Sequence, residues 1–181
     1  GIGHTAMTAA ITDEAIGQRV GAWFPGLADR RYYRVHTDAT DFSDVATKSL
    51  GYIKQLKEAG SQEVVLLHVI NQRIIDGLMR HAMLEKDIMQ WRNKAEEIAQ
   101  ESLMETGKQL EEIGFSVKRI VNTGFPWDVI LDVEKKEDPS IIVIGSHGRS
   151  NIGGMFLGSV SDRVIRKSKR PVLVIKRDIE D

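Results

Sequence analysis

The stretch "SIIVIGSHGRSNIGGMFLGSVSDRV", residues 140–164, places a glycine-rich segment between an apolar run and a helical pattern. Residues 140–146 are nearly all apolar, which is typical of a parallel strand covered on both faces. Five glycines occur between positions 145 and 158. Glycine loses more backbone entropy on folding than any other residue, so this clustering indicates that something approaches the main chain closely.

Similar apolar runs recur along the chain, and helical patterns separate them. We predict strands over residues 32–39, 63–70, 115–122, 140–146 and 171–177. Helices are predicted from Ser43 to near Gly60, over 84–113, from Pro126 and from Ser159. Strands that alternate with helices predict an α/β fold, an open doubly wound sheet of five parallel strands with helices on both faces.

Two segments do not follow this alternation. Residues 71–83, "NQRIIDGLMRHAM", show no decisive pattern, and we interpret them as a mobile connection. Residues 1–30 show little periodicity and are interpreted as a poorly determined N-terminal extension, derived in part from an expression vector. The prediction is therefore a single domain over residues 31–178.

The composition narrows the possible partners. The 181 residues include 25 Lys plus Arg and 26 Asp plus Glu, which gives a net charge of -1. That balance provides no general attraction to nucleic acid or to anionic membranes. The chain has no cysteine, which excludes disulfides and thiolate metal sites. It shows neither a secretory signal nor an apolar run long enough for a transmembrane helix, so we expect a cytoplasmic protein.

Three familiar glycine or serine motifs do not fit the segment. A dinucleotide fingerprint needs G-x-G-x-x-G after the first strand, and the chain has G-x-G only at its terminus. A P-loop needs a lysine after its last glycine, whereas Ser159 follows Gly158 directly. A serine-hydrolase elbow needs G-x-S-x-G, which is absent from this segment, although His147 and Asp162 lie near several serines.

A fourth pattern fits, namely G-x(2)-G-x(9)-G-[ST], formed by Gly145, Gly148, Gly158 and Ser159. The first two glycines let the backbone pass close to a flat or sugar-like group at the carboxyl end of a strand. The last glycine brings the chain against phosphates where a helix begins, and the first N–H groups of that helix point at the anion. The pattern favours a nucleotide, and the remaining alternative is a loop whose glycines only make turns.

These residues resemble a known family. "GSHGRSNIGGMFLGSVSDRVIRKSKRPVLVIKR" (145–177), "TDFSDVATKSL" (40–50) and "VVLLHVI" (64–70) resemble the ATP-binding branch of the universal stress proteins. The resemblance covers about residues 39–177. It implies a Rossmann-like, adenine-nucleotide alpha hydrolase-like sheet in the order 3-2-1-4-5, and a homodimer joined through the last strand, 171–177.

The resemblance also implies which residues surround the ligand. Asp41 would contact the nucleoside, and it is equally suited to capping the following helix. Val69 would offer backbone groups to adenine, and His147 or Arg149 could approach the phosphates. The full set of implied binding residues is Ala39, Thr40, Asp41, Val69, Gly145, His147, Gly148, Arg149, Gly158, Ser159, Val160 and Ser161.

The implied cofactor is ATP, with ADP or AMP as alternatives, and Mg²⁺ or Mn²⁺ held through phosphate oxygens and water. No catalytic residue is assigned. One feature departs from the family, because "RVHTDA" (34–39) places His36 and Asp38 where the first strand should be apolar. Either this strand starts late, or the chain diverges from the family up to about residue 38.

Three functions therefore remain open. The first is an ATP-binding, stress-response regulatory module with little or no hydrolysis. The second is a slow ATPase or phosphotransferase, which the missing P-loop lysine disfavours. The third is a protein-interaction module that has lost its nucleotide.

Overall fold

The computed structural model describes residues 32–36, 44–58, 60–80, 84–145 and 158–175, with side chains from residue 51 onward. Within these residues one five-stranded parallel sheet is formed in the order β3-β2-β1-β4-β5, which is the order that the resemblance implied. The strands are β1 (Tyr32–His36), β2 (Glu63–Asn71), β3 (Ser116–Gly124), β4 (Ile141–Gly145) and β5 (Val172–Ile175).

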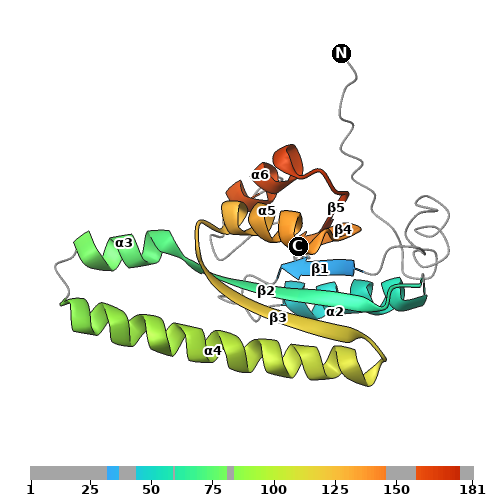
Figure 1. Ribbon diagram of the computed structural model, residues 1–181, viewed down its shortest axis with the longest axis horizontal. Coiled ribbons are helices and arrows are strands. Elements are labelled where there is room, and N and C mark those ends of the chain that lie inside the picture. The colour runs from blue at the N-terminus through green and yellow to red at the C-terminus, as the bar shows by residue number, and fades with distance from the viewer. Residues whose placement is uncertain (1–31, 37–43, 59, 81–83, 146–157, 176–181) are drawn as a thin grey trace, which may run out of the picture.

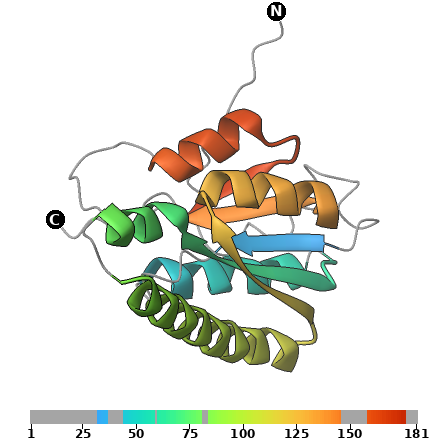
Figure 2. The ribbon, with the colours of Figure 1, turned by 60° about the vertical axis from the view of Figure 1, so that its left-hand side comes forward.

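Helices cover both faces of this sheet, as predicted (Figures 1 and 2). Helices α2 (Asp44–Glu58) and α4 (Glu85–Glu112) pack on one face. Helices α5 (Pro126–Glu137) and α6 (Ser159–Lys167) lie side by side on the other. The four predicted helices are thus confirmed, with bounds that differ by one or two residues.

The interior strand β2 shows why both faces of the sheet must be covered. Its residues Val64 to Ile70 are all buried, so neither side of the strand is left to solvent. Leu67 and Val69 pack against α5 and α6, whereas Val64 and Leu66 pack against α2 and α4. Because successive side chains of a strand point to opposite faces, a continuous apolar run fills two cores at once.

The interpretation of residues 71–83 as a mobile connection is wrong for most of that segment. Residues Gln72–Arg80 form helix α3, which continues directly from β2 and projects beyond the sheet (Figure 1). The Asn71 side chain accepts a hydrogen bond from the Arg73 N–H at 3.0 Å, which is a helix N-cap. Ile75 is buried against Ile70 and Ile88, so α3 has a small core of its own.

The first strand occupies its expected place despite its polar sequence. Strand β1 begins at Tyr32, so the suggestion of a late start is wrong, and its last residue His36 pairs with Leu67 of β2 and Ile144 of β4. Asp38 lies outside the described residues. Among the helices that the structure describes, none has the length and apolar character to span a membrane.

Candidate functional site

The order of the sheet reverses at β1, and this places a candidate site at the carboxyl ends of β1 and β4. The chain passes from β1 to β2 and β3, then returns to the other side of β1 to form β4 and β5. Ligands of open α/β sheets bind at such a reversal, outside the carboxyl ends of the strands. Val69 and Gly145 both lie beyond the level of His36, on either side of β1, two strand spacings or about 10 Å apart.

Helix α6 begins at this same edge of the sheet. Only residues 168–171 separate Lys167 from the start of β5, so the end of α6 lies near the amino ends of the strands and its start lies at the carboxyl ends. Gly158 is the N-cap, with φ -61° and ψ 153° and no side-chain hydrogen bond to the cap. Asp162 makes the first intrahelical bond, to the Gly158 carbonyl at 2.9 Å, so the N–H groups of Ser159 and Val160 precede it.

Apolar contacts fix the position of this helix start. Val164 is fully buried against the face of β4 that carries Ile142 and Ile144, and Val160 packs on the same cluster. The Ser161 hydroxyl donates a hydrogen bond to the Gly158 carbonyl at 2.9 Å, and Ser161 is only 2% exposed. Its hydroxyl therefore serves the first turn of α6, whereas Ser159 is exposed.

Two residues that follow α6, Lys169 and Arg170, make contacts with α5 and its C-cap. Arg170 is paired with Asp138, and the Lys169 N–H donates a hydrogen bond to the buried Glu134 carboxylate at 2.8 Å. These two contacts attach the segment between α6 and β5 to the end of α5.

Two cationic side chains of α6 lie over the ring of Trp127. The Arg163 guanidinium lies 5.1 Å from the centre of its ring, and the Lys167 ammonium lies 4.6 Å from it. Both distances are within the range of cation–π attraction. This cluster was not predicted from the sequence, because the three side chains come from two separate helices and only the packing of α5 on α6 brings them together.

The predicted binding residues are distributed unevenly over the described part of the chain. Val69 is 2% exposed, so its side chain belongs to the core. Gly145 ends β4, and Gly158 to Ser161 form the start of α6. The other predicted residues lie outside the described ranges, namely Ala39, Thr40, Asp41, His147, Gly148 and Arg149.

The ionisable groups with raised pKa values among the described residues, Lys94 of α4 and Lys135 of α5, are not among the residues of the candidate site. Hydrogen bonding to Glu97 raises the pKa of Lys94, and hydrogen bonding to Asp132 raises that of Lys135. Both lysines are fully exposed on helices, so neither shift marks an acid or base of the candidate site. The described residues also contain no group of three or more side chains that could hold a metal ion.

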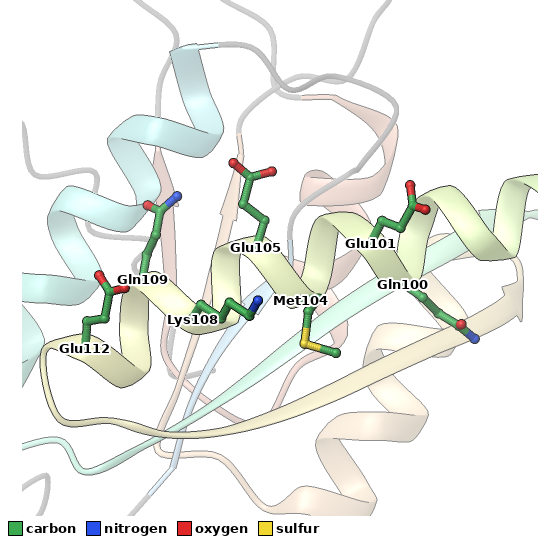
Figure 3. A pocket seen from close by; sticks show the side chains of 7 residues that line it. All are labelled: Gln100, Glu101, Met104, Glu105, Lys108, Gln109 and Glu112. Atoms are coloured by element: carbon green, nitrogen blue, oxygen red, sulfur yellow. The ribbon is translucent and has the colours of Figure 1, made fainter.

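A hollow of the described surface lies elsewhere, on the C-terminal half of α4 (Figure 3). That half of α4 precedes the start of β3, so it lies toward the amino ends of the strands and opposite the candidate site. The described side chains that line it come from this one helix, as Figure 3 shows, and they are Gln100, Glu101, Met104, Glu105, Lys108, Gln109 and Glu112. The hollow therefore shares no residue with the candidate site.

The order of the strands, and helix α6, which begins where that order reverses, define an α/β protein of the adenine-nucleotide alpha hydrolase-like class. Residues 38–176 match the profile of the universal stress protein family. The chain therefore belongs to the universal stress protein family.

Relatives support this assignment. Universal stress protein MJ0577 of Methanocaldococcus jannaschii is 39% identical over 148 residues, which cover 76% of this chain and 91% of the relative. The solved structure of MJ0577 superposes with a TM-score of 0.72 and 36% identity, over 83% of this chain and 99% of the other.

A more distant structure is a universal stress protein family member of Arabidopsis thaliana with AMP bound. It has a TM-score of 0.56 and 20% identity, and the match covers 82% of this chain and 92% of the other. Another, a universal stress protein in complex with cAMP, has a TM-score of 0.52 and 19% identity, over 81% and 97%. Both share the fold of this chain.

Proposed function

We propose that this protein binds ATP at the carboxyl ends of β1 and β4 and acts as a nucleotide-dependent regulatory module of the stress response. The observation that carries the proposal is the start of α6, where a glycine N-cap and two N–H groups precede the first intrahelical bond beside β4. Such a helix start attracts phosphate through its N–H groups and the positive end of its dipole. The adenine nucleotides in two related structures, AMP and cAMP, support the choice of ligand.

In this proposal the main chain does most of the binding. The N–H groups of Ser159 and Val160 donate to the phosphates, the exposed Ser159 hydroxyl adds one donor, and Ser161 belongs to the same first turn of α6. Gly145 passes close to the ribose because it has no side chain. Val69, whose side chain is buried in the core, offers only its backbone to adenine.

The remaining assignments rest on the family pattern. Ala39, Thr40 and Asp41 border the nucleoside, and His147, Gly148 and Arg149 border the phosphates. Mg²⁺ or Mn²⁺ accompanies the nucleotide, held by phosphate oxygens and water, because Mg²⁺ keeps most of its water when it binds to protein sites. We assign no catalytic group and expect at most weak ATPase activity, since a γ-phosphate transfer needs a positioned base and strong charge stabilisation.

The proposal includes the organisation of the protein. Residues 31–178 form one domain, residues 1–30 are an extension of it, and the protein is cytoplasmic. Strand β5 is at the edge of the described sheet, and its residues Val172, Leu173 and Val174 are only partly buried. An apolar edge strand can pair with another chain, so we assign the homodimer contact to residues 171–177.

One pair of substitutions separates main-chain from side-chain binding at α6. Ser159→Ala removes only the hydroxyl, whereas Ser159→Pro also removes the N–H. Proline is favoured at the first position of a helix, and the Gly158 backbone, at φ -61° and ψ 153°, is in the region required before proline. The helix therefore tolerates both changes, which circular dichroism verifies.

The measurement is the affinity for ATP with Mg²⁺, by calorimetry, together with acid extraction of nucleotide from the purified wild type. We expect wild-type binding, a small loss for Ser159→Ala, and a further loss of about tenfold or more for Ser159→Pro, because hydrogen bonds to charged groups contribute about 1.5–3 kcal/mol. Wild-type protein that neither retains nor binds adenine nucleotide refutes the proposal. Equal affinities of the two variants refute the role of the N–H group.

A further inference from the structure

Arg163 differs from the neighbouring arginines of its segment in having no carboxylate partner among the described residues. Arg166 is paired with Asp162 at 2.9 Å, and Arg170 is paired with Asp138. Arg163 is exposed, and its described partner is the ring of Trp127, at 5.1 Å. A ring face attracts a cation without neutralising it, so the full positive charge of this guanidinium remains available to an anion.

The position of Arg163 on α6 puts that charge beside the start of the helix. Ser159 and Arg163 are four residues apart and therefore lie on the same helix face. Side chains of an α-helix lean toward its N-terminus, so we expect the Arg163 side chain to reach toward the turn that begins at Ser159. Trp127, on which the guanidinium rests, is the second residue of α5, which starts just after β3 ends at the same carboxyl edge.

We propose that Arg163 is a specificity-determining residue that contacts the terminal phosphates of the nucleotide, so that the site prefers ATP and ADP to AMP. This inference rests on the proposed function and adds the class of nucleotide to it. The N–H groups of the first turn bind the phosphate nearest to the helix, and an arginine one turn further binds a longer phosphate chain through its planar fork of donors. Trp127 keeps the free guanidinium at the site, which lowers the entropy lost on binding.

Lys167 provides the matched control. Its ammonium lies on the same Trp127 ring, at 4.6 Å, and it carries the same charge. It is two turns from Ser159, a rise of about 12 Å along the helix. Arg163 is one helical turn nearer to the start of α6, so a direct contact with phosphate should depend on Arg163 and not on Lys167.

The experiment measures the dissociation constants of ATP, ADP and AMP for the full chain and for Arg163→Gln and Lys167→Gln, by calorimetry in 0.15 M salt with Mg²⁺. Both substituted residues are exposed, so both variants should fold, and thermal melts check this. We expect Arg163→Gln to bind ATP roughly tenfold more weakly and AMP almost unchanged, as for the loss of one charge-assisted contact. We expect Lys167→Gln to bind all three like the wild type.

The possible failures can be told apart. If the wild type binds none of the nucleotides, the proposed function itself is wrong. If the wild type binds them but Arg163→Gln keeps the same ratio of ATP to AMP affinity, only the role of Arg163 is wrong. An equal effect of the two substitutions would show a general influence of charge and would also overturn the assignment.

Discussion

Replacing Gly107 with alanine tests a contact that stabilises the fold. Gly107 is buried in the C-terminal half of α4, and a Cβ atom at this position would overlap the guanidinium of Arg119 from β3. The Arg119 Nε donates to the Leu103 carbonyl at 3.1 Å, and its Nη2 is paired with Glu111 at 2.9 Å. An alanine would displace the guanidinium and break both contacts.

The structure predicts an effect opposite to that of helix propensity. Glycine is less favourable than alanine within a helix by about 1 kcal/mol, so propensity alone makes Gly107→Ala stabilising. The carbonyl contact with a charged donor contributes about 2 kcal/mol and the half-exposed ion pair about 0.5 kcal/mol. We therefore expect the substitution to lower the free energy of unfolding by about 1.5 kcal/mol. In an Arg119→Ala background the same substitution should raise it by about 1 kcal/mol.

The assay is a double-mutant cycle, in which urea unfolding of the four proteins is followed by circular dichroism at one protein concentration. The expected coupling between the two positions is about 2.5 kcal/mol from the values above. If Gly107→Ala stabilises the wild type, or if the effects of the two substitutions add within about 0.5 kcal/mol, then Arg119 does not require a glycine at this position.

Substitutions at two further positions test the attachment of α3 and of α6. Asn71→Ala removes the N-cap of α3 and should cost about 1 kcal/mol locally, so amide exchange in α3 should accelerate about fivefold while β2 is unchanged. Equal amide exchange rates of α3 in the wild type and in Asn71→Ala would contradict the role of Asn71 as the N-cap. Glu134→Ala leaves the Lys169 N–H without its acceptor and should cost about 1–3 kcal/mol in urea unfolding, whereas Glu134→Gln keeps an acceptor oxygen and should cost less. Equal losses for the two variants would contradict this reasoning.

The main elements of the fold could be predicted from the sequence because their signals are local. The apolar run of β2 and the long periodic pattern of α4 determine those elements almost regardless of context. Helix α3 was missed because it is short, contains Gly77 and has a single buried residue, Ile75. The stability of α3 depends on packing against α4, and a local stretch of sequence does not reveal such a contact.

The candidate site, too, could be predicted only in part. The start of α6 was predicted because a glycine followed by serine is itself a signal for a helix N-terminus. The placement of Arg163 on Trp127 was not predicted, since it arises only when α5 and α6 lie side by side. Likewise, the sequence gives no sign that Gly107 accommodates an arginine from a neighbouring strand.

The attachment of α6 to α5 has a mechanical consequence. Glu134 and Asp138 hold the residues immediately before β5, while Val164 anchors the middle of α6 on β4. A tilt of α6 about Val164 would therefore pull on the short segment that leads into β5. Through this segment the first turn of α6 is mechanically connected to the outermost strand.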